Sequence, residues 1–481
     1  MPGKSFPPVV LDATLLDLLK LDQRDGEQIE TLCKFKPNSE FKYGHAVPLN
    51  NKYIIHSAQV GSGEDLAHLQ LENTSHLLMF FAGPMNVIFI GSEGNVDDSS
   101  LSRDAVDQNA KRSFSVIEES QRPNISTYAN VRDLIKKHDG TKIRWGFAMD
   151  FAESMPYLIH PDVIYRLNSK RWLAECDLKS ANDQIIDNEI VCSKHETPHF
   201  LWYNGGDDCQ ECKDGIKGEV KRVTDLLSNA KAPYVLKLTQ SLSAVGTNIV
   251  KDDKEKAALV ERMEDYLSNY TPRITTENAH LHTTSLILSE FIKGPTHALN
   301  FHVRKDGSVI FLGACNQLAT GEEGRQSTAM TYADQPELEK KFRKILDDIG
   351  RTLHHEGYWG PCGADVMQNP DTGVMFTIDL NVRTALSLLL YLLKGHFVDK
   401  HGFSIATIYE CTMLTISRDD LEEKFEKELS EARLVLLGAT RLGEKKQYAY
   451  GMIIAGEAQE AISKVNDALL EYEAKDAQVD G

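Results

Sequence analysis

The chain has 481 residues, of which 41% are hydrophobic and 26% charged, an ordinary balance for a globular protein with several structural units and buried cores. Its formal net charge of −18, with no basic stripe to offset it, argues against nucleic acid and anionic membranes as partners. The sequence shows no secretion signal and no apolar run near the ~20 residues of a membrane span. Its eight cysteines are too scattered for a disulfide framework, so a reducing, cytoplasmic setting is expected.

In the first third of the chain, apolar runs alternate with helical stretches. Buried strands are expected within 76–91 and 141–151, with a helical stretch at 126–138 between them. This alternation is typical of an α/β domain. The polar stretch 180–217 is rich in turn residues, and it is predicted to be an insertion.

Regular elements resume after the insertion. A helix is expected at 219–229 and a long one at 335–356, and strands are expected at 233–239, 285–293, 299–304 and 308–313. The apolar run 385–393 is too short to span a membrane and is predicted to be a buried helix. The tail, with ARLVLLGAT, KKQYAYGMIIAG and a helix near 458–474, is predicted to be a small β-rich cap closed by a helix.

A hairpin between the long helix and the buried helix carries three oxygen-bearing side chains. Asp379 and Asn381 are two residues apart, so they point to the same face of a strand, and Asp365 lies on the strand before. If the hairpin is symmetric about Asp371, Asp365 faces Thr377 and is diagonal to Asp379. Such oxygen ligands suit Mg²⁺, although the same residues also fit a solvated acidic hairpin.

A second group of residues is suited to phosphate. Lys237 ends the apolar strand APYVLKL, and a small-residue segment containing Ser241, Ser243 and Gly246 follows it. Backbone N–H groups of such a loop can approach phosphate oxygens while the lysine adds a positive charge. Lys237 also fits an exposed strand end. The chain has neither a Walker A motif nor the motifs of protein kinases, which excludes both of those classes.

A third segment, Glu290 to Ile292, ends the apolar strand LILSEFI just before a Gly-Pro turn. An exposed strand end there can offer backbone groups to an adenine edge, with an acid for the exocyclic amine. Taken alone, the segment is simply the end of a strand.

In this order, the elements resemble the ATP-grasp superfamily of ATP-dependent ligases. The resemblance runs from about Lys170 to Arg383 and rests on NSKR opening a helix, VLKLTQSLSAVGTNIV, LSEFIKG, GADVM and FTIDLNVR. It implies an α/β fold with an α+β grasp. The expected parts are an N-terminal pre-ATP-grasp α/β domain (1–165), a two-subdomain ATP-grasp domain (166–395, with its nucleotide-clamping subdomain at about 219–293) and a small C-terminal α+β extension (396–481).

The resemblance also implies ATP and Mg²⁺, with Mn²⁺ as an alternative, as cofactors. Arg383 matches an arginine that many members direct at the acyl phosphate or the substrate carboxylate, so Arg383 and Lys237 are the catalytic candidates. The remaining roles implied are phosphate contacts for Lys170, Lys237, Ser241, Ser243 and Gly246, the adenine hinge for Glu290, Phe291 and Ile292, and metal binding for Asp365, Asp379 and Asn381.

The reaction implied is ADP-forming carboxylate–amine ligation. A small carboxylic acid, an amino acid above all, is activated as an acyl phosphate and joined to an amine, and analogy with peptide-forming members points to specialised metabolism. The alternatives are an ATP-grasp kinase or carboxylase acting on small molecules, and a nucleotide-binding regulatory protein with a decayed site. The identity of the substrates and the oligomeric state, a homodimer included, stay open.

Two positions depart from the superfamily pattern. Thr296 and then His297 follow the hinge Gly-Pro, where members commonly carry an acid for the ribose, and Gly363 stands where some peptide ligases have an arginine. Arg325, in the polar loop 319–328, is the nearest alternative cation. These departures favour altered or lost activity, whereas retention of both lysines and all three metal residues argues against decay.

The insertion holds a separate candidate site. His195 and His199 match the HExxH pattern of zinc proteases, but Pro198 is incompatible with the helix that this motif requires. A structural zinc is an alternative to plain loop residues for the set Cys192, His195, His199, Cys209 and Cys212. The other cysteines are predicted to fill the core. His280 and His282 are predicted to be surface histidines, with metal binding as the alternative.

Overall fold

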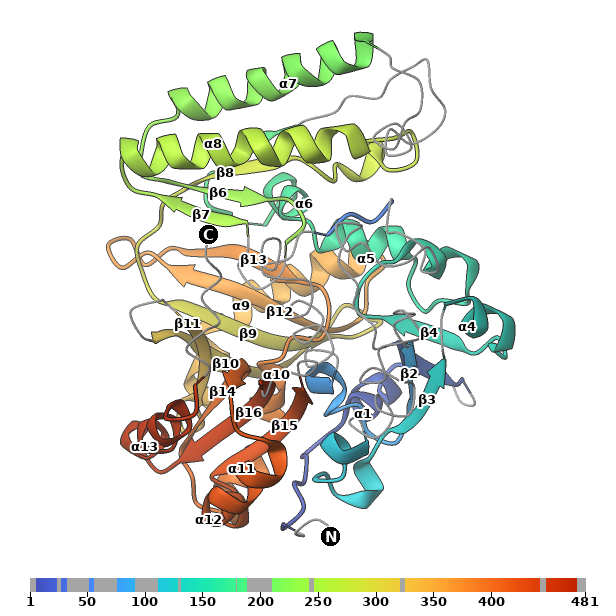
Figure 1. Cartoon of the computed structure of the whole chain (residues 1–481), viewed down its shortest axis with the longest axis vertical. Coiled ribbons are helices and arrows are strands. Elements are labelled where there is room, and N and C mark those ends of the chain that lie inside the picture. Colours follow the sequence, from blue (N-terminus) through green and yellow to red (C-terminus); the bar gives the residue numbers. More distant parts are fainter. Residues whose placement is uncertain are drawn as a thin grey trace.

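The structure is a computed structural model that describes residues 6–23, 27–32, 52–55, 76–90, 111–128, 131–178, 180–187, 210–241, 246–320, 325–441 and 447–473. Within these ranges the chain forms three β-sheets with helices packed against them (Figure 1). The predicted α/β fold class is confirmed. In the same ranges, no helix has the length and apolar character that crossing a membrane requires.

The N-terminal sheet is parallel throughout, with strand order β3-β2-β1-β4. Val87, Ile88 and Ile143 are fully buried, as expected for a parallel sheet covered on both faces. The strands are shorter than the apolar runs predicted, and the stretch 126–138 begins as a strand. The elements are α1 (Leu15–Lys20), β1 (Ile29–Leu32), β2 (Asn86–Ile90), β3 (Asn124–Tyr128), α4 (Val131–Lys137), β4 (Lys142–Trp145) and η3 (Asp150–Ser154), with η2 (Glu119–Gln121) before β3.

The second sheet is antiparallel, in the order β5-β8-β6-β7, and we call it the clamp sheet. Figure 1 shows α7 and α8 lying together at the end of the molecule beside this sheet. Leu227 and Leu259 of these helices share a buried cluster with Leu236 and Leu286 of the sheet. The elements are β5 (Gln184–Ile186), α7 (Gln210–Asn229), β6 (Tyr234–Leu238), β7 (Thr247–Val250), α8 (Asp253–Tyr270) and β8 (Leu286–Glu290), with η5 (Thr271–Arg273) and η6 (Ala279–Leu281) between the last two.

Two short helices, α5 (Pro161–Leu167) and α6 (Lys170–Glu175), join the N-terminal sheet to the clamp sheet. Helix α7 begins nine residues before the predicted helix at 219–229, so it occupies part of the predicted insertion. The first part of that insertion, 180–187, contains β5, whereas 188–209, with Cys192, His195, His199 and Cys209, lies outside the described residues. The side chain of Cys212 is not described either, so the zinc hypothesis stays untested.

The largest sheet is antiparallel, in the order β13-β12-β9-β10-β11-β14-β16-β15, and we call it the long sheet. The strands predicted for the C-terminal cap continue this sheet, because β14 pairs with β11. Its strands are β9 (Thr296–Val303), β10 (Val309–Thr320), β11 (Arg325–Thr331), β12 (Gly360–Gln368), β13 (Met375–Asn381), β14 (Ile405–Leu414), β15 (Leu434–Arg441) and β16 (Tyr448–Gly456). The helices after β11 are α9 (Gln335–His355), α10 (Leu388–Leu392), the π-helical turn η7 (Gly395–Lys400), α11 (Arg418–Lys424), α12 (Glu426–Ser430) and α13 (Gln459–Leu470).

One of the predictions made above is confirmed here, one holds in part and one is revised. The run 385–393 contains the buried helix α10, which shares a core with α1 and β2 of the N-terminal part. Cys315 and Cys362 are buried core residues, whereas Cys176 and Cys411 are half-buried. The loop predicted at 319–328 is shorter, since β10 reaches Thr320 and β11 begins at Arg325, whose side chain is not described.

Candidate active site

The hairpin of β12 and β13 brings the three predicted metal ligands to one face. Asp365 lies directly opposite Asp379, and Gly363 lies opposite Asn381. Directly opposed residues of antiparallel strands share a face, as do residues two apart along a strand. The side chains of Asp365, Asp379 and Asn381 therefore point to the same side of the long sheet.

The register of this hairpin corrects the predicted one. Asp365 does not face Thr377, because the pairing shifts by one residue and Val366 takes that position. Ile378 is left over as the extra residue of a β-bulge. Its carbonyl oxygen accepts a hydrogen bond from Nζ of Lys237, at 3.0 Å, so a lysine of the clamp sheet binds the bulge of the metal hairpin.

Both predicted phosphate lysines point toward this hairpin. Nζ of Lys170 lies 3.3 Å from Oδ1 of Asp379. Lys170 is the first residue of α6, and the side chain of Ser169 caps that helix. The start of α6 is fixed to the end of β6, because the N–H of Lys170 donates to the carbonyl of Thr239 and the two hydroxyls of Ser169 and Thr239 are 2.7 Å apart. Lys170 and Lys237 are 7% and 8% exposed.

Burial and neighbouring charges shift the pKa values of two groups at the hairpin, Asp365 and Lys237. Desolvation, followed by the negative charge of Asp379, raises the pKa of Asp365 to about 7, although a hydrogen bond with Gln317 acts in the opposite direction. Burial lowers the pKa of Lys237, and the charge of Lys170 adds to this, against the attraction of nearby carboxylates. A divalent cation between the two carboxylates would relieve both their desolvation and their repulsion, so this donor set fits Mg²⁺.

Arg383 lies beside the hairpin, held by a residue that the sequence did not single out for a role. Strand β13 ends at Asn381, so Arg383 lies two residues past its end. Its Nη1 donates to Oδ1 of Asn168 at 3.0 Å, and the same oxygen accepts the N–H of Val382. The guanidinium also lies 5.1 Å from the ring centre of Phe147, within range of a cation–π interaction.

Phe147 places Arg383 at the edge of the N-terminal sheet where ligands of such sheets bind. Phe147 comes two residues after β4, at the carboxyl end of that strand. The chain order of the strands reverses beside β1, so β1 and β4 flank the switch point of the sheet. Open parallel sheets bind ligands outside the carboxyl ends at such a point. Arg383 thus lies between the hairpin of β12 and β13 and the carboxyl end of β4.

The predicted adenine hinge belongs to the same sheet as Lys237. Glu290 ends β8 opposite Tyr234 of β6, and its exposed carboxylate accepts a hydrogen bond from Asn182. Phe291 is half-buried, and Ile292 is 7% exposed. The predicted hinge and the predicted phosphate lysine, Lys237, therefore lie on neighbouring antiparallel strands.

The phosphate loop is described only at its ends. Ser241 and Gly246 lie within the described residues, and Ser243 lies outside them. Gly246 has a φ of +74°, and a Cβ there would lie 2.6 Å from side-chain atoms of Leu238. Only glycine fits this position, which leaves the backbone close to the end of β6.

The two departures from the superfamily pattern occupy different environments. Thr296 pairs with Met367 and so shares the face of Asp365, whereas His297 lies on the opposite face against the ring of Phe342. A Cβ on Gly363 would lie 3.2 Å from that of Ala385, so an arginine in its place would be crowded.

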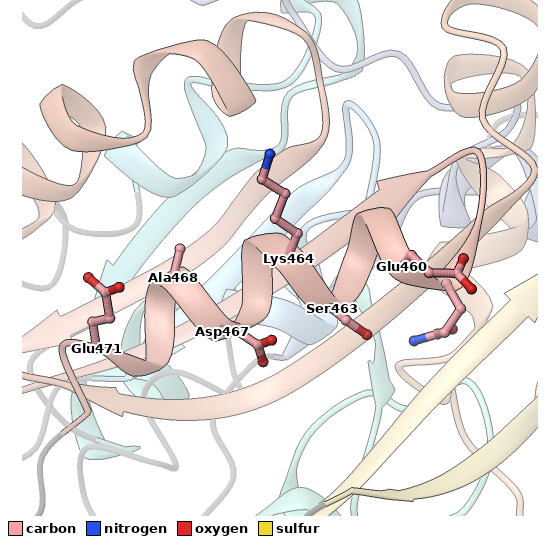
Figure 2. Close-up of a pocket in the computed structure, with 7 residues that line it drawn as sticks. Glu460, Ser463, Lys464, Asp467, Ala468 and Glu471 are labelled. Atoms are coloured by element: carbon pink, nitrogen blue, oxygen red, sulfur yellow. The ribbon is translucent and has the colours of Figure 1, made fainter.

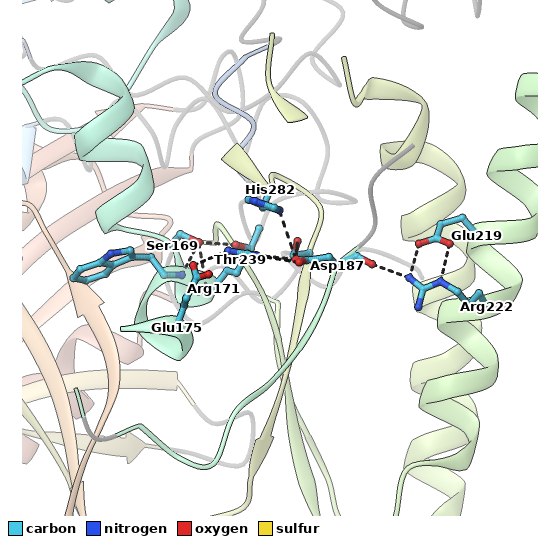
Figure 3. A network of polar contacts seen from close by, with 10 residues as sticks. Ser169, Arg171, Glu175, Asp187, Glu219, Arg222, Thr239 and His282 are labelled. Carbon is cyan, nitrogen blue, oxygen red and sulfur yellow. Dashed lines mark hydrogen bonds and ion pairs between the residues drawn. The ribbon is translucent and has the colours of Figure 1, made fainter. Parts of the chain in front are cut away.

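A polar network around Asp187 supports the helix that carries Lys170 (Figure 3). The carboxylate of Asp187 accepts hydrogen bonds from Nε and Nη2 of Arg171 at 2.7 and 2.9 Å and from Oγ of Ser285 at 2.7 Å. Its backbone carbonyl accepts a hydrogen bond from Arg222 of α7. His282, predicted to be a plain surface residue, lies 3.6 Å from the same carboxylate. Burial raises the pKa of Asp187, but these partners outweigh it and hold the pKa below its usual value.

We expect Asp187→Asn to lower the free energy of unfolding by about 1–2 kcal/mol, because it weakens a two-pronged, charge-assisted pair with Arg171. The control is Asp225→Asn on α7, whose partner Lys221 has a side chain that is 74% exposed and should therefore contribute almost nothing. Urea unfolding followed by circular dichroism measures both changes. Equal effects of the two substitutions would contradict a special role for Asp187.

A shallow hollow on α13 contains none of the predicted site residues (Figure 2). It runs along one face of that helix, from Gln459 to Glu471, and its side chains are mostly charged and exposed. In the described parts of the chain, no group of three His, Cys, Asp or Glu residues could hold a metal. The metal set at the hairpin therefore depends on the amide of Asn381.

Comparison with known proteins gives a likeness of structure only. No family model matches the sequence, and neither does any curated protein. An L-amino acid ligase from Bacillus licheniformis is 12% identical, with 94% of this chain and 99% of that chain covered and a TM-score of 0.48. An N5-carboxyaminoimidazole synthetase from Staphylococcus aureus, complexed with ADP, is 10% identical, with coverages of 93% and 98% and a TM-score of 0.47.

A third similar structure is the biotin carboxylase domain of the Hydrogenobacter thermophilus 2-oxoglutarate carboxylase, in complex with MgADP, ADP and bicarbonate. It is 11% identical, with 93% of this chain and 90% of that chain covered and a TM-score of 0.46. At such identities and TM-scores the likeness assigns no substrate, reaction or residue role, so the chemistry must be argued from the side chains.

Proposed function

We propose that the protein is an ATP-dependent, ADP-forming ligase that activates a small carboxylic acid and joins it to an amine. The observation that carries the proposal is the meeting of Lys170 and Lys237 with the opposed pair Asp365 and Asp379. A metal-bound nucleotide needs cations for its phosphates directly beside carboxylates for its metal. Lys170 Nζ and Asp379 Oδ1, 3.3 Å apart, provide that adjacency.

The residues divide into a phosphate group and a metal group. Lys170 and Lys237 would bind phosphate oxygens, each in place of its present partner at the hairpin. Asp365, Asp379 and Asn381 would hold Mg²⁺, or Mn²⁺ in its place. When bound, the metal would neutralise negative charge on the phosphates during transfer. Burial of both lysines strengthens their attraction for phosphate, because little water screens them.

Arg383 would orient the acid beside Phe147, at the carboxyl end of β4. The planar guanidinium group of Arg383 can donate two parallel hydrogen bonds to a carboxylate, and Asn168 accepts a hydrogen bond from one of its nitrogens, Nη1. A carboxylate oxygen then attacks the γ-phosphorus, the bond to ADP breaks, and an acyl phosphate forms. The nitrogen of a neutral amine attacks the acyl carbon, phosphate leaves, and the amine proton passes to solvent. Positioning and charge neutralisation suffice for such transfer, so no acid–base dyad is required.

A release screen tests this function. Pairs of amino acids, other small carboxylic acids and amines are incubated with Mg-ATP, and ADP and phosphate are measured together. We expect equal amounts of both, released only when acid and amine are present, and a product whose mass equals their sum less one water. A phosphorylated product would indicate a kinase, bicarbonate-dependent release a carboxylase, and ATP binding without ADP formation a regulatory protein.

A further inference from the structure

The two faces of the clamp sheet pack against different parts of the molecule. Leu236 belongs to the buried cluster of α7 and α8, whereas Lys237, the next residue of β6, points to the other face and reaches the carbonyl of Ile378 in β13. Figure 1 shows the clamp sheet between α8 and β13. We call the two sides the helix face and the lysine face. By register, the lysine face consists of Ile185, Val235, Lys237, Thr247, Ile249, Ile287 and Ser289.

Glu290, the acid expected to meet the exocyclic amine of adenine, lies on the helix face by the same register. It pairs with Tyr234, which belongs to the buried cluster of α7 and α8. Its carboxylate accepts a hydrogen bond from Asn182. A ligand that lies on the lysine face would therefore meet the backbone of the predicted hinge but not the carboxylate of Glu290.

Asp183 provides a carboxylate on the lysine face, at the end of the sheet where the predicted hinge begins. It comes one residue before β5 and continues the pairing of that strand, which places it opposite Ser289. The hydroxyl of Ser289 donates a hydrogen bond to Oδ1 of Asp183, so the two side chains lie on the same side of the sheet. Ser289 is 2% exposed, whereas Asp183 is half-buried. A carboxylate can accept several hydrogen bonds, so this one does not exhaust Asp183.

The lysine face therefore combines apolar surface with one cation and one carboxylate. Val235 is half-buried and Ile249 is 50% exposed. Asp183 lies two strands away from Lys237 and two residues along, a separation of about 12 Å between their Cα atoms by strand geometry. Burial lowers the pKa of Lys237, and the charge of Asp183 opposes this effect.

This arrangement matches the shape and polarity of a nucleotide. If its phosphates contact Lys237, the nucleotide extends across the apolar surface toward Asp183, and its base lies at the hinge end of the sheet. A carboxylate there accepts a hydrogen bond from the exocyclic amine of adenine. The same carboxylate repels the carbonyl oxygen that guanine carries at that ring position.

We propose that Asp183 determines base specificity by accepting a hydrogen bond from the exocyclic amine of adenine, while Glu290 contributes only its backbone to the hinge. The inference rests on the proposed ligase function, but it concerns nucleotide binding and is tested without acid or amine. In a merely structural role, Asp183 would only anchor the start of β5 through Ser289. Nucleotides with and without the amine would then respond alike to its loss.

The test measures the affinities for ATP, for purine riboside triphosphate and for GTP by isothermal titration in the presence of Mg²⁺. Purine riboside triphosphate differs from ATP only in lacking the amine. Wild-type protein should bind ATP about 10- to 100-fold more tightly than this analogue, the effect of one hydrogen bond to a charged group, and GTP more weakly still. Asp183→Ala should lower the affinity for ATP to that for the analogue, whose own affinity should hardly change.

Asp183→Asn is the second variant, and it keeps the shape of the side chain. Its amide retains one acceptor oxygen and adds an N–H group that can donate to the carbonyl oxygen of guanine, so the difference in affinity between ATP and GTP should narrow from both sides. The control is Asp253→Ala, which removes the same charge from α8, where the side chain is 90% exposed. It should change none of the three affinities. Thermal unfolding shows whether each variant is folded.

The possible outcomes separate this inference from the proposed function. If Asp183→Ala weakens ATP and purine riboside triphosphate equally, or if wild-type protein binds these two nucleotides equally, the inference is wrong and the ligase function stands. If wild-type protein binds none of the three nucleotides, the ligase function and this inference are overturned together.

Discussion

Asp379→Ala is expected to reduce substrate-dependent ADP release by about a thousandfold or more. Asp379 faces Asp365 across the hairpin and contacts Lys170, so its loss would remove a proposed metal ligand and the partner of a proposed phosphate lysine. The metal contributes several kcal/mol to phosphoryl transfer, and each ~1.4 kcal/mol corresponds to a factor of ten. A coupled ADP assay across a range of Mg²⁺ concentrations measures the loss.

The matched control for this variant is Asp371→Ala. Asp371 lies in the exposed turn of the same hairpin, outside the candidate site. Its substitution by alanine removes the same carboxylate group as Asp379→Ala does. We expect it to leave ADP release near the wild-type rate. Activity of Asp379→Ala within tenfold of wild type, in protein that is folded by circular dichroism, would refute the metal assignment of the hairpin.

Lys237→Met should abolish ADP release while leaving the fold as stable as before, or more so. Lys237 is 8% exposed and burial lowers its pKa, so its positive charge opposes folding in the free protein. Methionine fills a similar volume without charge. It cannot bind phosphate or donate to the carbonyl of Ile378, and nucleotide affinity should fall at least about a hundredfold, the effect of losing a buried charged contact.

A fluorescent ATP analogue and thermal unfolding measure these two effects separately. Lys231→Met, six residues earlier on an exposed site before the same strand, serves as the control and should change neither. Wild-type nucleotide affinity in Lys237→Met would remove Lys237 from the phosphate site. A large loss of stability would instead mean that its bond to Ile378 is chiefly structural.

Local patterns were sufficient to predict which residues of the hairpin share a face, but not the pairing between its strands. Alternation along a strand places Asp379 and Asn381 together whatever their neighbours do. The partner of Asp365 depends on where an extra residue is accommodated, and nothing local marks Ile378 as that residue. Its carbonyl binds Lys237, which is more than a hundred positions away, so the bulge is accompanied by a tertiary contact.

The residues that the sequence reasoning missed all act across long distances in the chain. Asn168 binds Arg383 and Val382, over two hundred residues later, although it directly precedes residues that were singled out. Asp187 lay in a stretch interpreted as an insertion, and it binds Ser285, 98 residues later, as well as Arg171 on the preceding helix. The order of motifs gives the elements, whereas these contacts depend on how the elements fold together.

The continuity of the long sheet has a practical consequence for anyone who shortens the protein. Ending the chain at residue 395, the predicted limit of the ATP-grasp domain, would remove β14 and leave the hydrogen-bonding groups of β11 without their neighbouring strand. Newly bared strand edges recruit other chains and cause aggregation. The fragment would therefore be expected to precipitate, even though every predicted nucleotide and metal residue lies within it. A recombinant fragment should therefore extend at least to the end of α13, so that it includes β14, β15 and β16.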